Sequence, residues 1–211
     1  MKSVSEMEFL PAAPAGADDL AEARRIAERM MDLGAFRVRF GGAVDPQLAG
    51  ALREVCLMTA RLRAGRLPYW LTLAGTNGCG KTHLANWLGR RFAEVFAPGL
   101  LPRVWTVAEL KDAYLGGGWK LLSGLANEPW LVLDELGAER VSEAFREGFV
   151  SMLNARLGKW TVITTNLSER EIEAAYSPRV TSRMVRQGNV HYRLEVADYA
   201  TRRAEEERSS Q

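Results

Sequence analysis

A glycine-rich segment that reads GTNGCGKT, from Gly75 to Thr82, has the residue types and spacing of a phosphate-binding loop. Its glycines let backbone N–H groups curl around phosphate oxygens, because no Cβ stands in the way. Lys81 can reach the β- and γ-phosphates of a nucleotide, and the Thr82 hydroxyl can be a ligand of Mg²⁺. The segment predicts a nucleotide site; the alternative is a glycine-rich turn that matches by chance. The candidate cofactor-binding residues are Gly75, Asn77, Gly78, Cys79, Gly80, Lys81, Thr82 and His83.

Two acids, Asp134 and Glu135, follow the apolar run WLVL further along the chain. A phosphate site needs a carboxylate at the end of a neighbouring strand to hold the water shell of the metal, and Asp134 fits this role. Glu135 is the candidate general base for the attacking water. By themselves, two such acids also suit a solvated sheet edge. Their place after the loop, with one strand and one helical segment between, favours the catalytic interpretation, with Thr82 and Asp134 as the candidate metal ligands.

Further polar residues follow the segment TVITTN, which ends at Asn166. At the tip of a core strand beside the loop strand, Asn166 can orient water against the γ-phosphate; the alternative is an ordinary turn residue that caps the strand. Arg179, Arg183 and Arg186 then lie at spacings of four and three, which predicts that they share one helical face. That face is either solvated or supplies an arginine finger to the ATP of a neighbouring subunit.

The elements that must position these residues alternate between apolar runs and amphipathic segments. The expected strands read YWLTLAG, RVWTV, PWLVLDEL, KWTVITTN and NVHYRLEV. The expected longer helices are 19–33, 45 to about 64, HLANWLGRRFAEVF, with Leu84, Leu88, Phe92 and Val95 on one face, and SEAFREGFVSMLNARLG. Capping boxes that start with Thr106 and Ser168 predict shorter helices. Because the strands are apolar runs, we expect an α/β protein whose parallel sheet carries helices on both faces.

Composition excludes several classes of protein. The 211 residues suffice for one domain with a full core, and a net charge of +2 is no argument for a nucleic-acid partner. Two cysteines, Cys56 and Cys79, cannot form a disulfide scaffold or a four-cysteine zinc site. The N-terminus lacks the apolar core of a signal peptide, and no apolar run approaches the ~18 residues of a membrane span. We therefore expect a cytoplasmic protein without a membrane partner.

Three features are candidates for contact with nucleic acid. RLRAGR, from Arg61 to Arg66, is a basic cluster, and the stretch from Arg179 to Arg193 is another. Trp119 and Lys120 follow three glycines on an expected loop and can offer stacking and charge to a single strand. The alternative is a solvated face for the arginines and a packed position for the tryptophan.

Taken in order, these stretches resemble the ATPases of the AAA+ class. GTNGCGKTHLA, PWLVLDELG, LNARLGKWTVITTNLS and RVTSRM are similar to segments of the DnaC/DnaI-type bacterial helicase loaders and of their relatives, the IstB-type transposition helper ATPases. The resemblance covers about residues 65–196. GKTHLA and RVTSRM favour this family over P-loop proteins in general.

The resemblance implies a P-loop NTPase fold (ASCE/AAA+) with a five-stranded parallel sheet of order 5-1-4-3-2 and no lid domain. Lys81 and Thr82 would belong to the first nucleotide motif (Walker A), Asp134 to the second, and His83 would be a typical helix-start residue. The implied catalytic residues are Glu135 of the second motif, Asn166 as the first sensor, and Arg183, with Arg179 as the second choice, as a finger that acts on a neighbouring subunit.

The resemblance also implies a function. Family members bind ATP with Mg²⁺, assemble side by side on single-stranded DNA and hand over a ring helicase or a transposase. We therefore expect a replicative-helicase loader or DNA-replication accessory ATPase that hydrolyses ATP at subunit interfaces, with a transposition helper as the alternative. The expected partners are the helicase or transposase, single-stranded DNA and further copies of the chain. A nucleoside kinase is less favoured, because the acids, Asn166 and the arginines suit water as the acceptor. An isolated subunit that binds nucleotide but hydrolyses little stays open.

Residues 1–44 depart from the family pattern. Loaders usually carry a sizeable N-terminal domain that binds the helicase, sometimes with a zinc site, whereas here only about 45 residues precede the expected ATPase domain, 45–197, and they offer no zinc ligands. We expect a flexible arm and then the 19–33 helix, with FRVRF behind it. That helix either docks a partner or packs on the ATPase core. Residues 198–211 are expected to form a polar tail.

Overall fold

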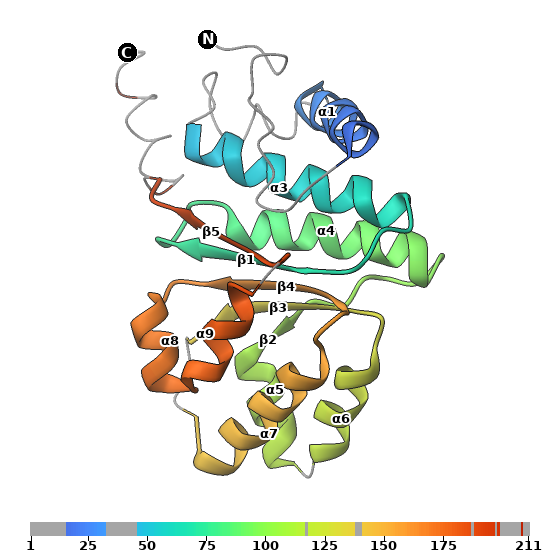
Figure 1. Ribbon diagram of the computed structural model, residues 1–211. Coiled ribbons are helices and arrows are strands. Elements are labelled where there is room, and N and C mark those ends of the chain that lie inside the picture. Colours follow the sequence, from blue (N-terminus) through green and yellow to red (C-terminus); the bar gives the residue numbers. More distant parts are fainter. Residues whose placement is uncertain are drawn as a thin grey trace.

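A single five-stranded parallel sheet with helices on both faces forms the described part of this computed structural model, residues 16–32, 46–116, 118–137, 141–186, 188–196, 198 and 208 (Figure 1). The strands are β1 (Trp70–Gly75), β2 (Trp105–Thr106), β3 (Trp130–Leu136), β4 (Trp160–Thr165) and β5 (Val190–Leu194). The helices are α1 (Ala17–Asp32), α3 (Pro46–Arg63), α4 (Lys81–Phe96), α5 (Val107–Leu115), α6 (Trp119–Asn127), α7 (Glu143–Ala155), α8 (Glu169–Ala175) and α9 (Pro178–Met184). The FRVRF segment, Asp45 and most of the tail lie outside the described residues.

The strand order is β2-β3-β4-β1-β5, which confirms the expected order read from the opposite edge. Every pairing is parallel, so the carboxyl ends of all five strands lie along one edge of the sheet. In open parallel sheets ligands bind at this edge, outside the strand ends. The residues that follow β1, β3 and β4 are thereby brought into one neighbourhood.

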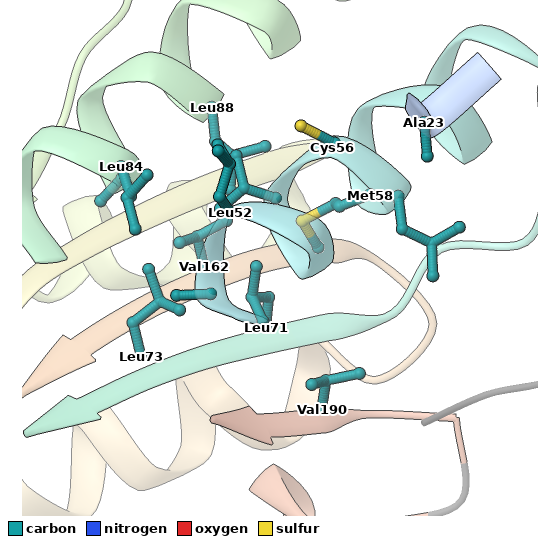
Figure 2. Close-up of a cluster of buried hydrophobic side chains, with 14 of the residues drawn as sticks. Ala23, Leu52, Cys56, Met58, Leu71, Leu73, Leu84, Leu88, Val162 and Val190 are labelled. Carbon is teal, nitrogen blue, oxygen red and sulfur yellow. The ribbon is translucent and has the colours of Figure 1, made fainter. Parts of the chain in front are cut away.

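The sheet separates two clusters of buried side chains. Helices α3 and α4 cover one face, and α5 to α9 cover the other (Figure 1). Figure 2 shows part of the first cluster, where Leu71 and Leu73 of β1 lie with Leu52 of α3 and with Leu84 and Leu88 of α4. Because side chains alternate along a strand, intervening residues such as Trp70 and Ile163 join the second cluster. Burial on both faces explains the continuous apolar runs of the strands.

Helix α1 packs on α3, beyond the sheet (Figure 1). Its buried face consists of Ala23, Ile26, Ala27 and Met30. The guanidinium of Arg66 also pairs with Asp19 at 3.2 Å, and that of Arg63 with Glu22 at 3.6 Å. The helix expected over 19–33 therefore packs on the body of the protein through one face, while Arg25, Glu28 and Arg29 stay exposed on the other.

A buried arginine ties the second face together. The Arg156 side chain follows α7 and donates to Thr161 Oγ1 at 3.0 Å, Trp160 O at 2.7 Å, Leu125 O at 2.5 Å and Glu128 O at 3.0 Å. Burial lowers the pKa of Arg156 to about 10, while the Glu128 carboxylate raises it, so the group stays charged at neutral pH. A cation here also suits the carbonyl-rich end of α6.

Several expected boundaries differ from the structure. RVWTV pairs only at Trp105 and Thr106, because the chain turns into α5 at once, with the expected capping box of Thr106 and Glu109 formed. The Ser168–Glu171 capping box is also confirmed. On the expected face of α4, Leu84, Leu88 and Phe92 are buried, whereas Val95, near the end of the helix, is 44% exposed.

Two further expectations were wrong and concern candidate site residues. Trp119 and Lys120 do not lie on a loop but begin α6, since Gly118 serves as its N-cap and apolar helix formers follow. Arg186 does not share the helical face of Arg179 and Arg183, because α9 ends at Met184. None of the described helices is long and apolar enough to cross a membrane.

Candidate active site

The glycine-rich loop connects the end of β1 to the start of α4, as the sequence predicts. Gly80 is the N-cap of α4 with φ 99°, and Gly78 has φ 69°, both in the left-handed region that favours glycine. Backbone N–H groups of the loop and of the first turn of α4 have no partner inside the helix. A helix start of this kind is a site for anions such as phosphate.

Lys81 lies inside the loop and is only 7% exposed. Its ammonium donates to Gly75 O at 2.9 Å and to Thr76 O at 2.6 Å. The loop carbonyls thus hold the charge at the strand end, where phosphates bound to the loop would meet it. The Cys79 side chain is buried in the core and its sulfur lies 3.6 Å from the same ammonium, so this thiol packs rather than facing solvent.

Thr82 and Asp134 meet across the gap between the loop helix and β3. The Thr82 hydroxyl donates to Oδ1 of Asp134 at 3.1 Å, and the carboxylate is only 5% exposed. Thr164 of β4 donates to the same oxygen in a short hydrogen bond. A hydroxyl beside a strand-end carboxylate is the pair that P-loop proteins use for Mg²⁺.

Glu135 occupies an unusual backbone position next to Asp134. Its φ is 60°, the only positive value at a non-glycine residue in the described part of the chain. The ladder between β3 and β4 is irregular here, between Leu133 and Leu136. At this irregularity Asp134 is buried, whereas Glu135 is exposed at the carboxyl edge of the sheet.

Asn166 follows β4 directly and contacts the phosphate loop. Its amide Nδ2 donates to Asn77 Oδ1 at 2.6 Å. Both side chains are exposed, so a ligand on the loop can reach them. The structure therefore brings together the loop, the two acids and the expected sensor residue at one edge of the sheet.

Two of the candidate arginines, Arg179 and Arg183, belong to α9. Arg179 is exposed, and Arg183 is half-buried, donating from Nη1 to Arg179 O at 2.7 Å. Desolvation lowers the pKa of Arg183, and the positive charges of Arg186 and Arg179 lower it further. Within the described residues, no hydrogen bond or ion pair joins Arg179 or Arg183 to the loop, the acids or Asn166 of the same chain.

The candidate nucleic-acid residues have mixed environments. In RLRAGR, Arg63 and Arg66 pair with acids of α1, and Arg61 lies 4.9 Å from the centre of the Tyr69 ring. Much of that cluster therefore serves the packing of α1. Trp119, in contrast, is 63% exposed, with the Lys120 ammonium 6.0 Å from its ring.

The segment after β5 lies against the loop and was missed by sequence reasoning. Thr76 Oγ1 donates to Val196 O at 2.9 Å, and a Cβ at Gly78 would lie 1.9 Å from Oδ2 of Asp198. An open depression of about 490 Å³ adjoins the loop here, lined by Thr76, Asn77, Glu195, Val196 and Asp198. A side chain at position 78 would have to displace the Asp198 carboxylate.

The donor set is compatible with a magnesium–nucleotide complex. Among the described residues there is no group of three or more His, Cys, Asp or Glu that could hold a metal ion by itself. Mg²⁺ in phosphate sites is held by one or two protein oxygens plus phosphates and water, so Thr82 and Asp134 suffice.

The strand order, the loop after β1 and the acids at the end of β3 define the AAA+ P-loop fold, which confirms the expected fold. Three solved structures resemble the chain with nearly equal TM-scores. A DnaI structure has a TM-score of 0.58 and 21% identity over 71% of this chain and 86% of that one. The DnaC helicase loader has a TM-score of 0.56 and 26% identity over 72% of this chain and 92% of that one. DnaA bound to AMPPCP and single-stranded DNA has a TM-score of 0.56 and 18% identity, over 75% of this chain and 50% of the DnaA chain.

The chain therefore spans about half of the length of that initiator. No family model and no curated protein matches the chain. The comparisons relate this protein to helicase loaders and replication initiators at the level of the AAA+ fold.

Proposed function

We propose that the protein is a Mg²⁺-dependent ATPase that acts as a helicase loader or accessory factor in DNA replication. The observation that carries this proposal is the contact of Thr82, at the start of the loop helix, with Asp134 at the end of β3. A phosphate loop alone serves many reactions. A loop joined to paired acids, with a polar residue on the next strand, favours hydrolysis with water as the acceptor.

The residues have distinct tasks in this proposal. Backbone N–H groups of the loop bind the phosphates, and Lys81 turns from its loop carbonyls toward the β- and γ-phosphates. Mg²⁺ beside Thr82 and Asp134 would neutralise charge on the phosphate oxygens. Glu135, exposed at the strand edge, takes the proton of the attacking water, and Asn166 donates its amide to the γ-phosphate or to that water.

An arginine of α9 is proposed to complete the site of an adjacent subunit. Arg183 is the first choice and Arg179 the second, because within the described residues neither forms a hydrogen bond or ion pair with the site of its own chain. A positive charge that arrives from a neighbour stabilises the charge of the transition state. Hydrolysis would then depend on assembly of several copies of the chain.

The place in replication rests on the resemblance to the DnaC helicase loader. We expect the partner to be a replicative helicase, in the cytoplasm, and we expect single-stranded DNA to contact Trp119 and Lys120 at the exposed start of α6. A filter-binding assay with a salt titration tests the DNA contact: no affinity above that of a neutral control protein at low salt would refute it.

A pull-down with ATP and Mg²⁺ tests the client protein. The expected prey is the replicative helicase, and retention of a transposase instead would overturn the replication role. Because removal of α1 would uncover the buried face of α3, a docking role of α1 is better tested by the double change Arg25→Glu and Arg29→Glu on its exposed face. Arg90→Glu, on the exposed side of α4, is the matched control.

A further inference from the structure

One residue of β4 lies opposite both acids of β3. In the ladder of these two strands, Leu133 pairs with Ile163 and Leu136 pairs with Thr165. The two residues Asp134 and Glu135 therefore face the single residue Thr164, which is the arrangement of a β-bulge. Bulges next to active sites redirect side chains, and here Asp134 is buried while Glu135 is exposed.

The Thr164 hydroxyl uses both of its hydrogen-bonding capacities within this bulge. It accepts the backbone N–H of Glu135 at 2.9 Å and donates its own proton to Oδ1 of Asp134. Oδ1 also accepts the Thr82 hydroxyl at 3.1 Å. A hydroxyl has one proton to donate and lone pairs that accept. The hydrogen bonds therefore run in one direction, from the backbone N–H of Glu135 to the Thr164 hydroxyl and from that hydroxyl to the Asp134 carboxylate.

The environment of Thr164 makes this chain hard to replace. Its side chain is 1% exposed, so bulk water does not reach the hydroxyl. The N–H of Glu135 has left the regular ladder and depends on Thr164 for a partner. Glu135 also holds a left-handed backbone conformation that non-glycine residues rarely adopt and that surrounding contacts must maintain.

We infer that Thr164 is a positioning residue for hydrolysis. Its single hydroxyl holds the Asp134 carboxylate and the backbone of Glu135 in place relative to the phosphate loop. The inference rests on the proposed ATPase function. Thr164 is not itself proposed to contact the nucleotide: it is buried, and its hydroxyl bonds the backbone N–H of Glu135 and the carboxylate of Asp134. Loss of the hydroxyl leaves the loop and Lys81 intact, so nucleotide binding survives. The two acids, however, are no longer held in position by a common hydrogen-bonding partner.

The test compares three variants of the full chain. Thr164→Val removes the hydroxyl and keeps the β-branched shape, and Thr164→Ser keeps the hydroxyl and removes the methyl group. Thr72→Val is the matched control, because Thr72 is a buried strand threonine whose hydroxyl has no hydrogen-bond partner among the described residues. The measurements are kcat and KM for ATP, nucleotide affinity with and without Mg²⁺, and the thermal midpoint of unfolding.

For Thr164→Val we expect kcat to fall at least about tenfold with KM changed less than about threefold, and Mg²⁺ to increase nucleotide affinity less than in the unmodified protein. Without Mg²⁺, the affinity should stay within about twofold, and Thr164→Ser should restore most of kcat. A kcat of Thr164→Val within about threefold of that of Thr72→Val, or a loss that Thr164→Ser also shows, would overturn the inference.

Two further outcomes need their own criteria: a Thr164 variant that does not fold, and an unmodified chain that does not hydrolyse ATP. If Thr164→Val does not fold, Thr164→Ala takes its place, because alanine also lacks the hydroxyl, and the same criteria apply. If the unmodified chain does not hydrolyse ATP, the proposed function fails by itself. The Mg²⁺ effect on nucleotide affinity then tests Thr164 alone, and an unchanged effect in Thr164→Val would overturn its role.

Discussion

The amide group of Asn166, at the end of β4, donates a hydrogen bond to the side-chain oxygen of Asn77 in the phosphate loop at 2.6 Å. This bond joins two segments that are distant in the sequence and adjacent at the carboxyl edge of the sheet. A γ-phosphate bound to the loop is a stronger acceptor than an amide oxygen. Binding of ATP is therefore expected to draw the Asn166 donor away from Asn77.

Asn166→Ala should lower kcat for ATP by roughly 10²-fold with nucleotide affinity changed only a few-fold, because the lost donor acts mainly on the transition state. Steady-state kinetics and a titration with a fluorescent nucleotide check both values. Asn127→Ala is the control, since Asn127 is an exposed, hydrogen-bonded amide on α6. A variant that binds poorly but retains kcat would assign Asn166 to binding instead.

Lys81→Ala should weaken ATP binding by at least about 10²-fold, because no other cation in the described residues donates to the loop carbonyls. Isothermal titration calorimetry measures the affinity directly. The matched control is Lys111→Ala, which removes a lysine of α5 that pairs with Asp112 at 3.8 Å. Affinity like that of the control protein would contradict the assignment of the loop.

Arg183→Ala should keep nucleotide binding. Its rate of assembly-dependent ATP hydrolysis should fall by about 10³-fold, as expected when one subunit supplies a positive charge to the site of another. Mixing Arg183→Ala with Lys81→Ala subunits gives the sharper measurement: an intact loop then meets an intact arginine at some interfaces, so part of the turnover returns. Turnover of Arg183→Ala at saturating protein and DNA equal to that of the unmodified chain would point to Arg179, whose alanine variant is examined in the same way.

Arg156→Met should lower the free energy of unfolding by about 3 kcal/mol, because it leaves three backbone carbonyls and a threonine hydroxyl without their donor. Urea denaturation followed by circular dichroism measures the change. Arg90→Met on the exposed side of α4 should change it by less than about 0.5 kcal/mol. Equal stability of the two variants would show that Arg156 is not a structural anchor.

Much of the fold was predictable because the apolar runs, the glycine-rich loop and the capping residues are local signals. The end of β1 at Gly75 and the capping boxes at Thr106 and Ser168 lie as expected. The strand order came from the family resemblance and matches the sheet. The loop and Asp134 follow from such signals as well, since an apolar strand and the residue that follows it can be read from a short segment.

What could not be predicted depends on contacts between distant segments. Thr164 lies in the run TTN, but its role follows from the bulge that sets two residues of β3 opposite one of β4. The contact of Asp198 with Gly78 arises only when the chain after β5 returns to the loop. Arg186 was assigned to a helical face by spacing, yet α9 ends two residues earlier, at Met184.

The most direct test of the central claim is steady-state ATP hydrolysis by the assembled protein with Mg²⁺ and single-stranded DNA, compared with Glu135→Gln. The carboxamide keeps the size of the side chain but cannot accept the proton of the attacking water. We expect turnover by the unmodified chain and a loss of at least about 10²-fold in Glu135→Gln, with ATP binding preserved. Hydrolysis by Glu135→Gln at the rate of the unmodified chain, or no Mg²⁺-dependent hydrolysis by either protein, would contradict the assignment of this site as an ATPase centre.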